Sequence, residues 1–221
     1  MDYKKSRDLA WKILINNGIN ALPVDVVSIC RKEKINLFTY KQSAELIRVL
    51  GLEENTKGND AFSINSMIFY DDEKPCERQR FSIAHELGHI FLHSETSGKV
   101  TVYNREPSPN DNPLEAEANI FASRILAPLC VLQFLNLNSI NEVAEYCDIS
   151  FSAAKFRFAR LCEIRQRNSK RRKEKNRGTF LISKLERELV ENFKDYIEKN
   201  KKRDYYNEDE KHSVNENEEE S

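Results

Sequence analysis

The spacing of apolar residues over the first seventy positions alternates between helical and extended patterns. Apolar positions three or four apart predict an amphipathic helix over about 4–17, and Pro23 is expected to open a second helix. The segments 35–40 and 61–70 have the patterns of strands, and 43–60 is expected to hold a short helix followed by a turn region. These elements predict a small sheet accompanied by helices.

Two longer helices are predicted next. The first covers about 75–93, and its apolar residues fall on two faces, which is typical of a helix buried in the middle of a domain. The second covers about 113–127 and must end there, because Pro128 disfavours helical backbone at the residue before it. The polar segment 94–112 between them is expected to be a loop.

Beyond residue 138 the pattern is helical and then strongly charged. Two helices are predicted over 139–161, separated by a turn at 147–150. The run 165–177 carries eight Lys or Arg and one acid, and the stretch 180–197 has one apolar helical stripe that could form a coiled coil or dock on the core. The acidic tail from Asp204 has almost nothing to bury, so disorder is expected there.

These changes of pattern predict four parts and an α+β fold class. Residues 1–135 are expected to form the main domain, and 136–162 a helix-turn-helix-like helical subdomain packed on it. Residues 163–203 are expected to form a basic and amphipathic helical extension, and 204–221 the acidic tail.

Charge and cysteine content narrow the class of protein. The net charge of −1 argues against wholesale binding to nucleic acid or anionic lipid. The five cysteines are odd in number and have no C-x-x-C spacing, which indicates a reducing compartment. The N-terminal apolar stretch is too short and too charged for a signal peptide or a membrane span, so a cytoplasmic protein is expected.

The predicted helix 75–93 contains the sequence His85-Glu86-Leu87-Gly88-His89. Residues four apart project from the same side of a helix, so His85 and His89 can place two imidazoles on one zinc ion. Glu86 then lies beside the metal, where it can deprotonate a metal-bound water for attack on a peptide carbonyl. The competing interpretation is two polar residues on an exposed face, but it must explain Gly88, which costs about 1 kcal/mol inside a helix.

A third protein ligand is required for zinc, and an acid on the next helix is the best candidate. Glu115 shares its helical face with Ala118 and Ala122, and small residues there would let the two helices pack closely. Asn112 to Glu115 also fits a capping box, in which Glu115 would return to the start of its own helix. Glu117, on another face, is the other candidate.

His93 lies on the same helical face as the two histidines, one turn further on. Four residues advance a helix by roughly 6 Å, so His93 is expected to lie too far along the axis to reach the ion. Its expected role is contact with a metal-binding residue, or packing.

Both motifs together resemble the ImmA/IrrE family of metallopeptidases. The matching sequences are Arg80-Phe81-Ser82-Ile83-Ala84-His85-Glu86-Leu87-Gly88-His89, Glu115-Ala116-Glu117-Ala118-Asn119-Ile120-Phe121-Ala122 and Ile125-Leu126-Ala127-Pro128. The resemblance covers about residues 5–162 and implies a compact zincin-like domain with a small sheet and a central metal helix. It also implies a cytoplasmic zinc endopeptidase, often encoded by mobile elements, that cleaves a helix-turn-helix repressor. His85, His89 and Glu115 would be the metal ligands and Glu86 the general base.

The resemblance leaves the substrate contacts to be found. An extended substrate is expected along an edge strand near the metal, and 61–70 is the candidate. An oxyanion donor is also required, for which Tyr103 and Arg105 are candidates. Where the family usually has Met before the proline, this chain has Ala127, and the chain beyond residue 162 has no counterpart in the family.

The helices over 139–161 allow a second hypothesis. Arg157 and Arg160 could contact phosphates, although packing beneath the catalytic core and contact with a protein partner explain the pattern equally well. The runner-up function is therefore a non-proteolytic regulator that binds a repressor or DNA through residues 139–177. DNA binding is not favoured, because positive charge alone positions a nucleic acid without specifying its sequence. The enzyme is favoured over the regulator, because a pure binding module has no need of a water-activating glutamate.

Overall fold

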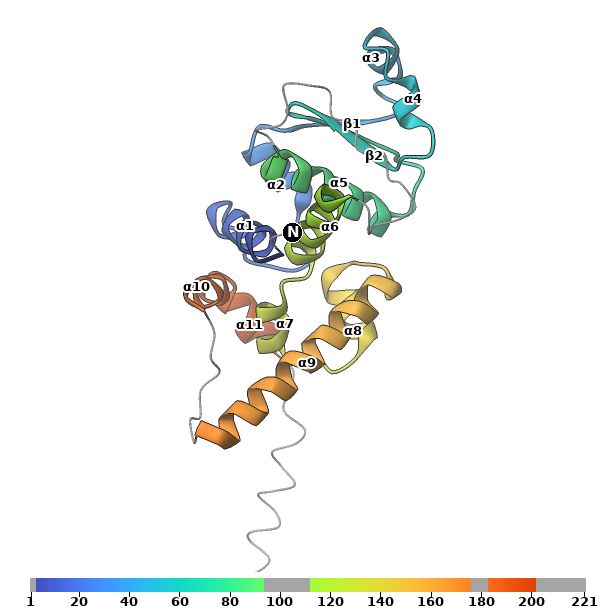
Figure 1. The fold of residues 1–221 in the computed structure, drawn as a ribbon. Coiled ribbons are helices and arrows are strands. Elements are labelled where there is room, and N and C mark those ends of the chain that lie inside the picture. The colour runs from blue at the N-terminus through green and yellow to red at the C-terminus, as the bar shows by residue number, and fades with distance from the viewer. Residues whose placement is uncertain (1–2, 94–111, 176–182, 202–221) are drawn as a thin grey trace, which may run out of the picture.

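The computed structural model describes residues 3–93, 112–175 and 183–201 (Figure 1). The loop predicted at 94–112, except its last residue, and the acidic tail from Asp204 therefore lie outside the described residues. So do the two candidate oxyanion donors, Tyr103 and Arg105.

A three-stranded sheet forms one layer of the fold. It consists of β1 (Asn36–Thr39), β2 (Ala61–Ile64) and β3 (Met67–Tyr70) in the order β1-β3-β2. β1 is parallel to β3, whereas β2 is antiparallel to it and lies at the edge of the sheet. The single strand predicted over 61–70 is wrong: Asn65 has φ +52° and turns the chain into a hairpin, since asparagine tolerates the left-handed conformation.

One helix lies against the sheet at the centre of the molecule, and a second helix packs along it (Figure 1). α5 (Cys76–His93) packs against β2 and β3 and also along α6 (Pro113–Leu126). Every residue over 82–89 is buried, which confirms the prediction of a central helix with more than one buried face. Asn112 caps α6 through a hydrogen bond from the Leu114 amide to its Oδ1, 3.0 Å long.

The N-terminal helices pack against the sheet and against α5 and α6. α1 (Tyr3–Asn16) packs along α6, as its amphipathic pattern allows. α2 (Val26–Lys32) begins three residues later than predicted, because Asp25 rather than Pro23 starts it by accepting a hydrogen bond from the Ser28 amide. α3 (Ala44–Val49) and the one-turn α4 (Glu53–Thr56) pack with the sheet around a second, smaller apolar cluster that includes Phe62 and Phe69.

Five helices form the C-terminal half of the described chain: α7 (Leu129–Leu135), α8 (Ile140–Cys147), α9 (Phe151–Lys175), α10 (Lys184–Asn192) and α11 (Lys194–Asn200). α7 follows directly on α6 and was not predicted, because its nearly continuous apolar sequence has no clear period. α9 continues across residue 162, where the sequence predicted a boundary between two parts of the chain. The division into four parts stays a prediction. The apolar stripe on α10 and α11 docks on the core, with Leu189 and Phe193 fully buried against α1 and α7.

The stretch Pro113–Leu135 has the length and hydropathy of a membrane-spanning helix. Two thirds of its apolar window, 67%, is buried inside the protein. Burial in the core therefore accounts for its apolar character.

Gly88 marks the closest approach of α5 to α6. A Cβ atom at this position would lie 3.0 Å from the Cα atom of Ala118, 3.2 Å from its carbonyl oxygen and 3.2 Å from the Phe121 ring. Ala118 and Ala122 are fully buried, as expected for small residues at a tight helix contact. The cost of a glycine inside α5 is thus explained by the backbone contact that it permits.

We expect the substitution Gly88→Ala to destabilise the metal-free protein. Overpacking costs about 1–3 kcal/mol, and the higher helix propensity of alanine offsets about 1 kcal/mol of this. Urea denaturation measures the difference, and Ala159→Gly at an exposed position of α9 provides the propensity contribution alone with opposite sign. A Gly88→Ala protein more stable than the wild type would contradict the close approach.

Candidate metal centre

The side chains of His85, His89 and Glu115 converge at the contact between α5 and α6. The Nε2 atoms of the two histidines are 3.0 Å apart. Glu115 in the first turn of α6 places Oε2 at 3.2 Å from His85 Nε2 and Oε1 at 3.2 Å from His89 Nε2. All three residues are buried, and one ligand atom from each lies within 4.8 Å of the others.

The structure places the two candidate acids differently. Glu115 faces the histidine pair. The proposed capping box is not seen among the described contacts, because the Asn112 side chain accepts from the Leu114 amide rather than from the Glu115 amide. Glu117 instead lies with one carboxylate oxygen 3.3 Å from Nε2 of His93. Glu115 is thus the acid that lies beside His85 and His89, and its role as the third ligand stays a prediction.

Burial and charge determine the protonation of the cluster. Burial lowers the pKa of His89 to about 4, although the Glu115 carboxylate opposes this, so the ring is neutral near pH 7. Burial by itself raises the pKa of Glu115, but the two histidines beside it lower that pKa to about 2, so the carboxyl is ionised. Burial also lowers the pKa of His93, which favours its neutral ring.

The arrangement of electron pairs fits a divalent metal ion. Asn119 Oδ1 lies 3.0 Å from His85 Nδ1 and can only accept, so the ring hydrogen is on Nδ1 and the lone pair of Nε2 faces the cluster. Within the described part of the chain, the buried Oε1 of Glu115 accepts no hydrogen bond. Ligand atoms around a tetrahedral zinc are roughly 3.3 Å apart for bonds of 2.0–2.1 Å. The observed separations of 3.0–3.2 Å are close to this value, so His85, His89 and Glu115 could bind a metal ion.

Glu86 lies beside this cluster and is held from the sheet. It is buried, with an exposed fraction of 3%, and its Oε2 accepts a hydrogen bond of 2.7 Å from the Ser63 hydroxyl on β2. The bond joins the edge strand to the acid of the His-Glu-x-x-His sequence.

Two contacts at this site were missed from the sequence. Ser63 and Asn119 lie 23 and 34 residues from their partners Glu86 and His85, and single polar residues inside an apolar strand or helix give no periodic signal. The alternation of polar and apolar side chains along β2 is also hidden, because all four of its residues are buried.

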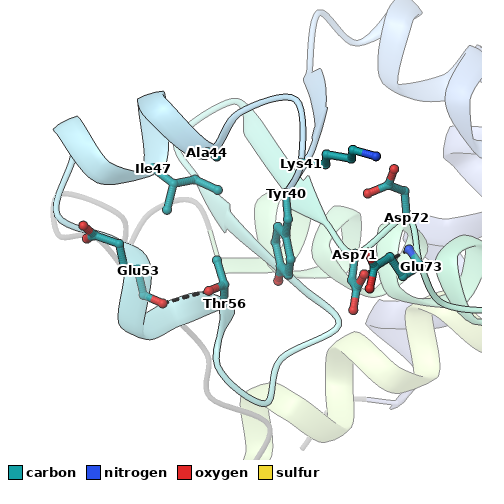
Figure 2. Close-up of a pocket in the computed structure, with 9 residues that line it drawn as sticks. All are labelled: Tyr40, Lys41, Ala44, Ile47, Glu53, Thr56, Asp71, Asp72 and Glu73. Carbon is teal, nitrogen blue, oxygen red and sulfur yellow. Dashed lines mark hydrogen bonds between the residues drawn. The ribbon is translucent and has the colours of Figure 1, made fainter.

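A separate cavity of about 430 Å³ lies between α3, α4 and the turn that follows β3 (Figure 2). Four acidic residues line it, namely Glu53, Asp71, Asp72 and Glu73. The other lining residues are Tyr40, Lys41, Ala44, Ile47 and Thr56. The Tyr40 hydroxyl donates to the Asn59 carbonyl, and burial followed by the charges of Glu86, Asp71 and Asp60 raises its pKa. His85, Glu86, His89 and Glu115 do not line this cavity.

The class of the protein follows from these observations. A small sheet, a central helix with His-Glu-x-x-His and an acid supplied by the next helix define a zincin-like metallopeptidase domain. Residues 33–159, more than half of the chain, match the family described as IrrE N-terminal-like domain, peptidase M78. The chain belongs to this family, which confirms the resemblance drawn from the sequence. A comparison with curated proteins gives no match.

We expect divalent metal ions to stabilise the wild-type protein and Glu115→Gln to remove most of this effect. A ligand at 1,000 times its Kd stabilises the folded state by about 4.1 kcal/mol. The measurement is the Tm of chelator-treated protein with and without added zinc. Glu188→Gln, at an exposed position of α10, is the matched control. An equal metal-dependent rise in Tm for Glu115→Gln and wild type would contradict the assignment.

Proposed function

We propose that the protein is a zinc-dependent endopeptidase with His85, His89 and Glu115 as metal ligands and Glu86 as general base. The observation that carries this proposal is the convergence of two histidine Nε2 atoms and the Glu115 carboxylate next to Glu86. Membership in a peptidase family supports the same reaction type. Zinc is favoured because two imidazoles, one carboxylate and an open position are a frequent donor set of catalytic zinc.

The chain's own residues then divide the reaction between them. His85, His89 and Glu115 would hold the zinc ion, which would supply Lewis acidity and lower the pKa of a bound water to about 7. Glu86 accepts the proton of the attacking water and delivers it to the amine that leaves. The Ser63 hydroxyl donates a hydrogen bond to Oε2 of Glu86 and so fixes the rotation of the carboxylate. The other carboxylate oxygen, Oε1, then accepts and returns the proton.

The edge strand is the proposed binding place for the substrate backbone. β2 pairs with β3 on one side, and no other described strand pairs with it. It also carries Ser63, so a peptide added along β2 would pass beside Glu86.

We further propose that the substrate is a regulatory protein, namely a helix-turn-helix repressor of a mobile element or a stress response, and that cleavage occurs in the cytoplasm. The support is the resemblance of both motifs to ImmA/IrrE proteins, together with cysteine usage suited to a reducing compartment. A repressor gene next to the gene of this protein would identify the first substrate to test.

The runner-up is a non-proteolytic regulator that binds a repressor or DNA through α9 and the basic run. It is favoured by one observation: Phe156 is 78% exposed on α9, and Lys155 and Arg160 are exposed nearby. Arg157 must be removed from this hypothesis, because it is buried and donates a hydrogen bond to the Ala127 carbonyl. The basic side chains at 170–173, which are part of the run 165–177, are not among the side chains that the structure describes.

The substitution Glu86→Gln separates the two functions. We expect the variant to keep about one zinc per chain but to cleave the cognate repressor 10²–10⁴-fold more slowly, which is the usual contribution of a general base. Zinc content is measured by elemental analysis and cleavage by electrophoresis of the repressor. Wild-type cleavage by Glu86→Gln, with loss of function in Lys155→Ser/Arg160→Ser instead, would establish the runner-up.

We expect Ser63→Ala to lower kcat and leave zinc content unchanged. A hydrogen bond to a charged group contributes about 1.5–3 kcal/mol, which corresponds to a loss of roughly 10–100-fold. Ser63→Thr keeps the hydroxyl and is the matched control. If the alanine and threonine variants turn over the repressor equally fast, Ser63 does not position Glu86.

A further inference from the structure

His93 connects the candidate metal centre to Glu117. It lies one turn after His89 at the end of α5 and is buried, with an exposed fraction of 6%. Its Nδ1 is 3.2 Å from His89 Nδ1, and its Nε2 is 3.3 Å from Glu117 Oε2. A continuous series of contacts thus runs from the Glu117 carboxylate through His93 to Nδ1 of His89.

The Glu117 carboxylate determines which ring nitrogens of His93 and His89 carry hydrogen. A carboxylate oxygen only accepts, so Nε2 of His93 carries the hydrogen that points to Glu117. In the neutral ring the remaining nitrogen, Nδ1, then has a lone pair. This lone pair faces Nδ1 of His89 and can accept its hydrogen.

His89 has two tautomers, and only one is suited to a metal ion. With the hydrogen on Nε2, the ring would donate to His85 Nε2 at 3.0 Å, and the hydrogen would occupy the place of the cation. With the hydrogen on Nδ1, the ring donates to His93 and presents the Nε2 lone pair to the cluster. The acceptor that His93 provides stabilises the second tautomer.

We infer that His93 and Glu117 are positioning residues that hold His89 in its metal-binding tautomer, as Asn119 does for His85. This inference rests on the proposed function. It gives the second acid of the Glu115-Ala116-Glu117 sequence a defined task, since Glu115 faces the metal side of His89 and Glu117 acts on its opposite side through His93.

The test compares variants of His93 that differ in hydrogen-bond capacity. His93→Phe keeps a buried aromatic ring but removes the acceptor, whereas His93→Gln offers a carbonyl oxygen in its place. We expect His93→Phe to weaken Co²⁺ and Zn²⁺ binding 10–100-fold, the usual effect of losing a group that orients a ligand, and His93→Gln to weaken it less. Competition with a chromophoric chelator measures the affinity.

Two further measurements separate positioning from packing. Urea denaturation of the metal-free proteins should give His93→Phe the same stability as wild type or a higher one, and the visible spectrum of bound Co²⁺ should change. Glu117→Leu, at a less buried position, should weaken binding more than Glu117→Gln, whose amide oxygen still accepts from His93. Glu188→Gln on α10 serves as the charge control.

The possible results are distinct. Binding by His93→Phe and Glu117→Leu within twofold of wild type, or equal losses in His93→Phe and His93→Gln, would overturn the inference while leaving the peptidase proposal intact. If the wild-type protein itself binds no metal, the proposed function fails.

Discussion

The backbone contact between α5 and α6 is the constraint on which the site depends. Glu115 has a short side chain, and it reaches both histidine Nε2 atoms only because the axes of the two helices come close at Gly88 and Ala118. The same contact is stabilised by apolar burial, since Phe121, Ala122 and Ile125 on α6 have no exposed surface. Core packing and metal geometry are therefore set by one interface, and a change in the helix separation alters both.

The site also has to satisfy polar groups in an apolar surrounding. Four ionisable side chains, those of His85, Glu86, His89 and Glu115, are buried there, and burial of such groups without partners costs several kcal/mol each. Polar contacts with neighbouring side chains offset part of this cost: Glu86 contacts Ser63, His85 contacts Asn119 and His89 contacts His93. What remains is a set of lone pairs directed at one point, which a divalent cation would satisfy.

The sequence allowed the local part of this arrangement to be predicted, but little of what depends on tertiary contacts. His85 and His89 share a face by helix geometry alone, and the alanines after Glu115 indicated its face correctly. In contrast, Ser63 meets Glu86 only because the hairpin at Asn65 brings β2 against α5. Asn65-Ser66 is a local signal for that hairpin, but the almost continuous apolar run on both sides of it is also typical of a single strand. Arg157 shows the opposite error, since its helical position suggested a surface role while its guanidinium is buried at the end of α6.

The position of the C-terminal helices limits what they can do. α10 packs on α1 and α7, and the Asn192 side chain donates a hydrogen bond of 2.7 Å to the Ile19 carbonyl. In Figure 1, α10 and α11 lie on the far side of α1 and α6 from the sheet, so they are remote from β2. Since Leu189, Phe193 and Ile197 complete the core there, α10 and α11 contribute to the stability of the main domain without lining the site.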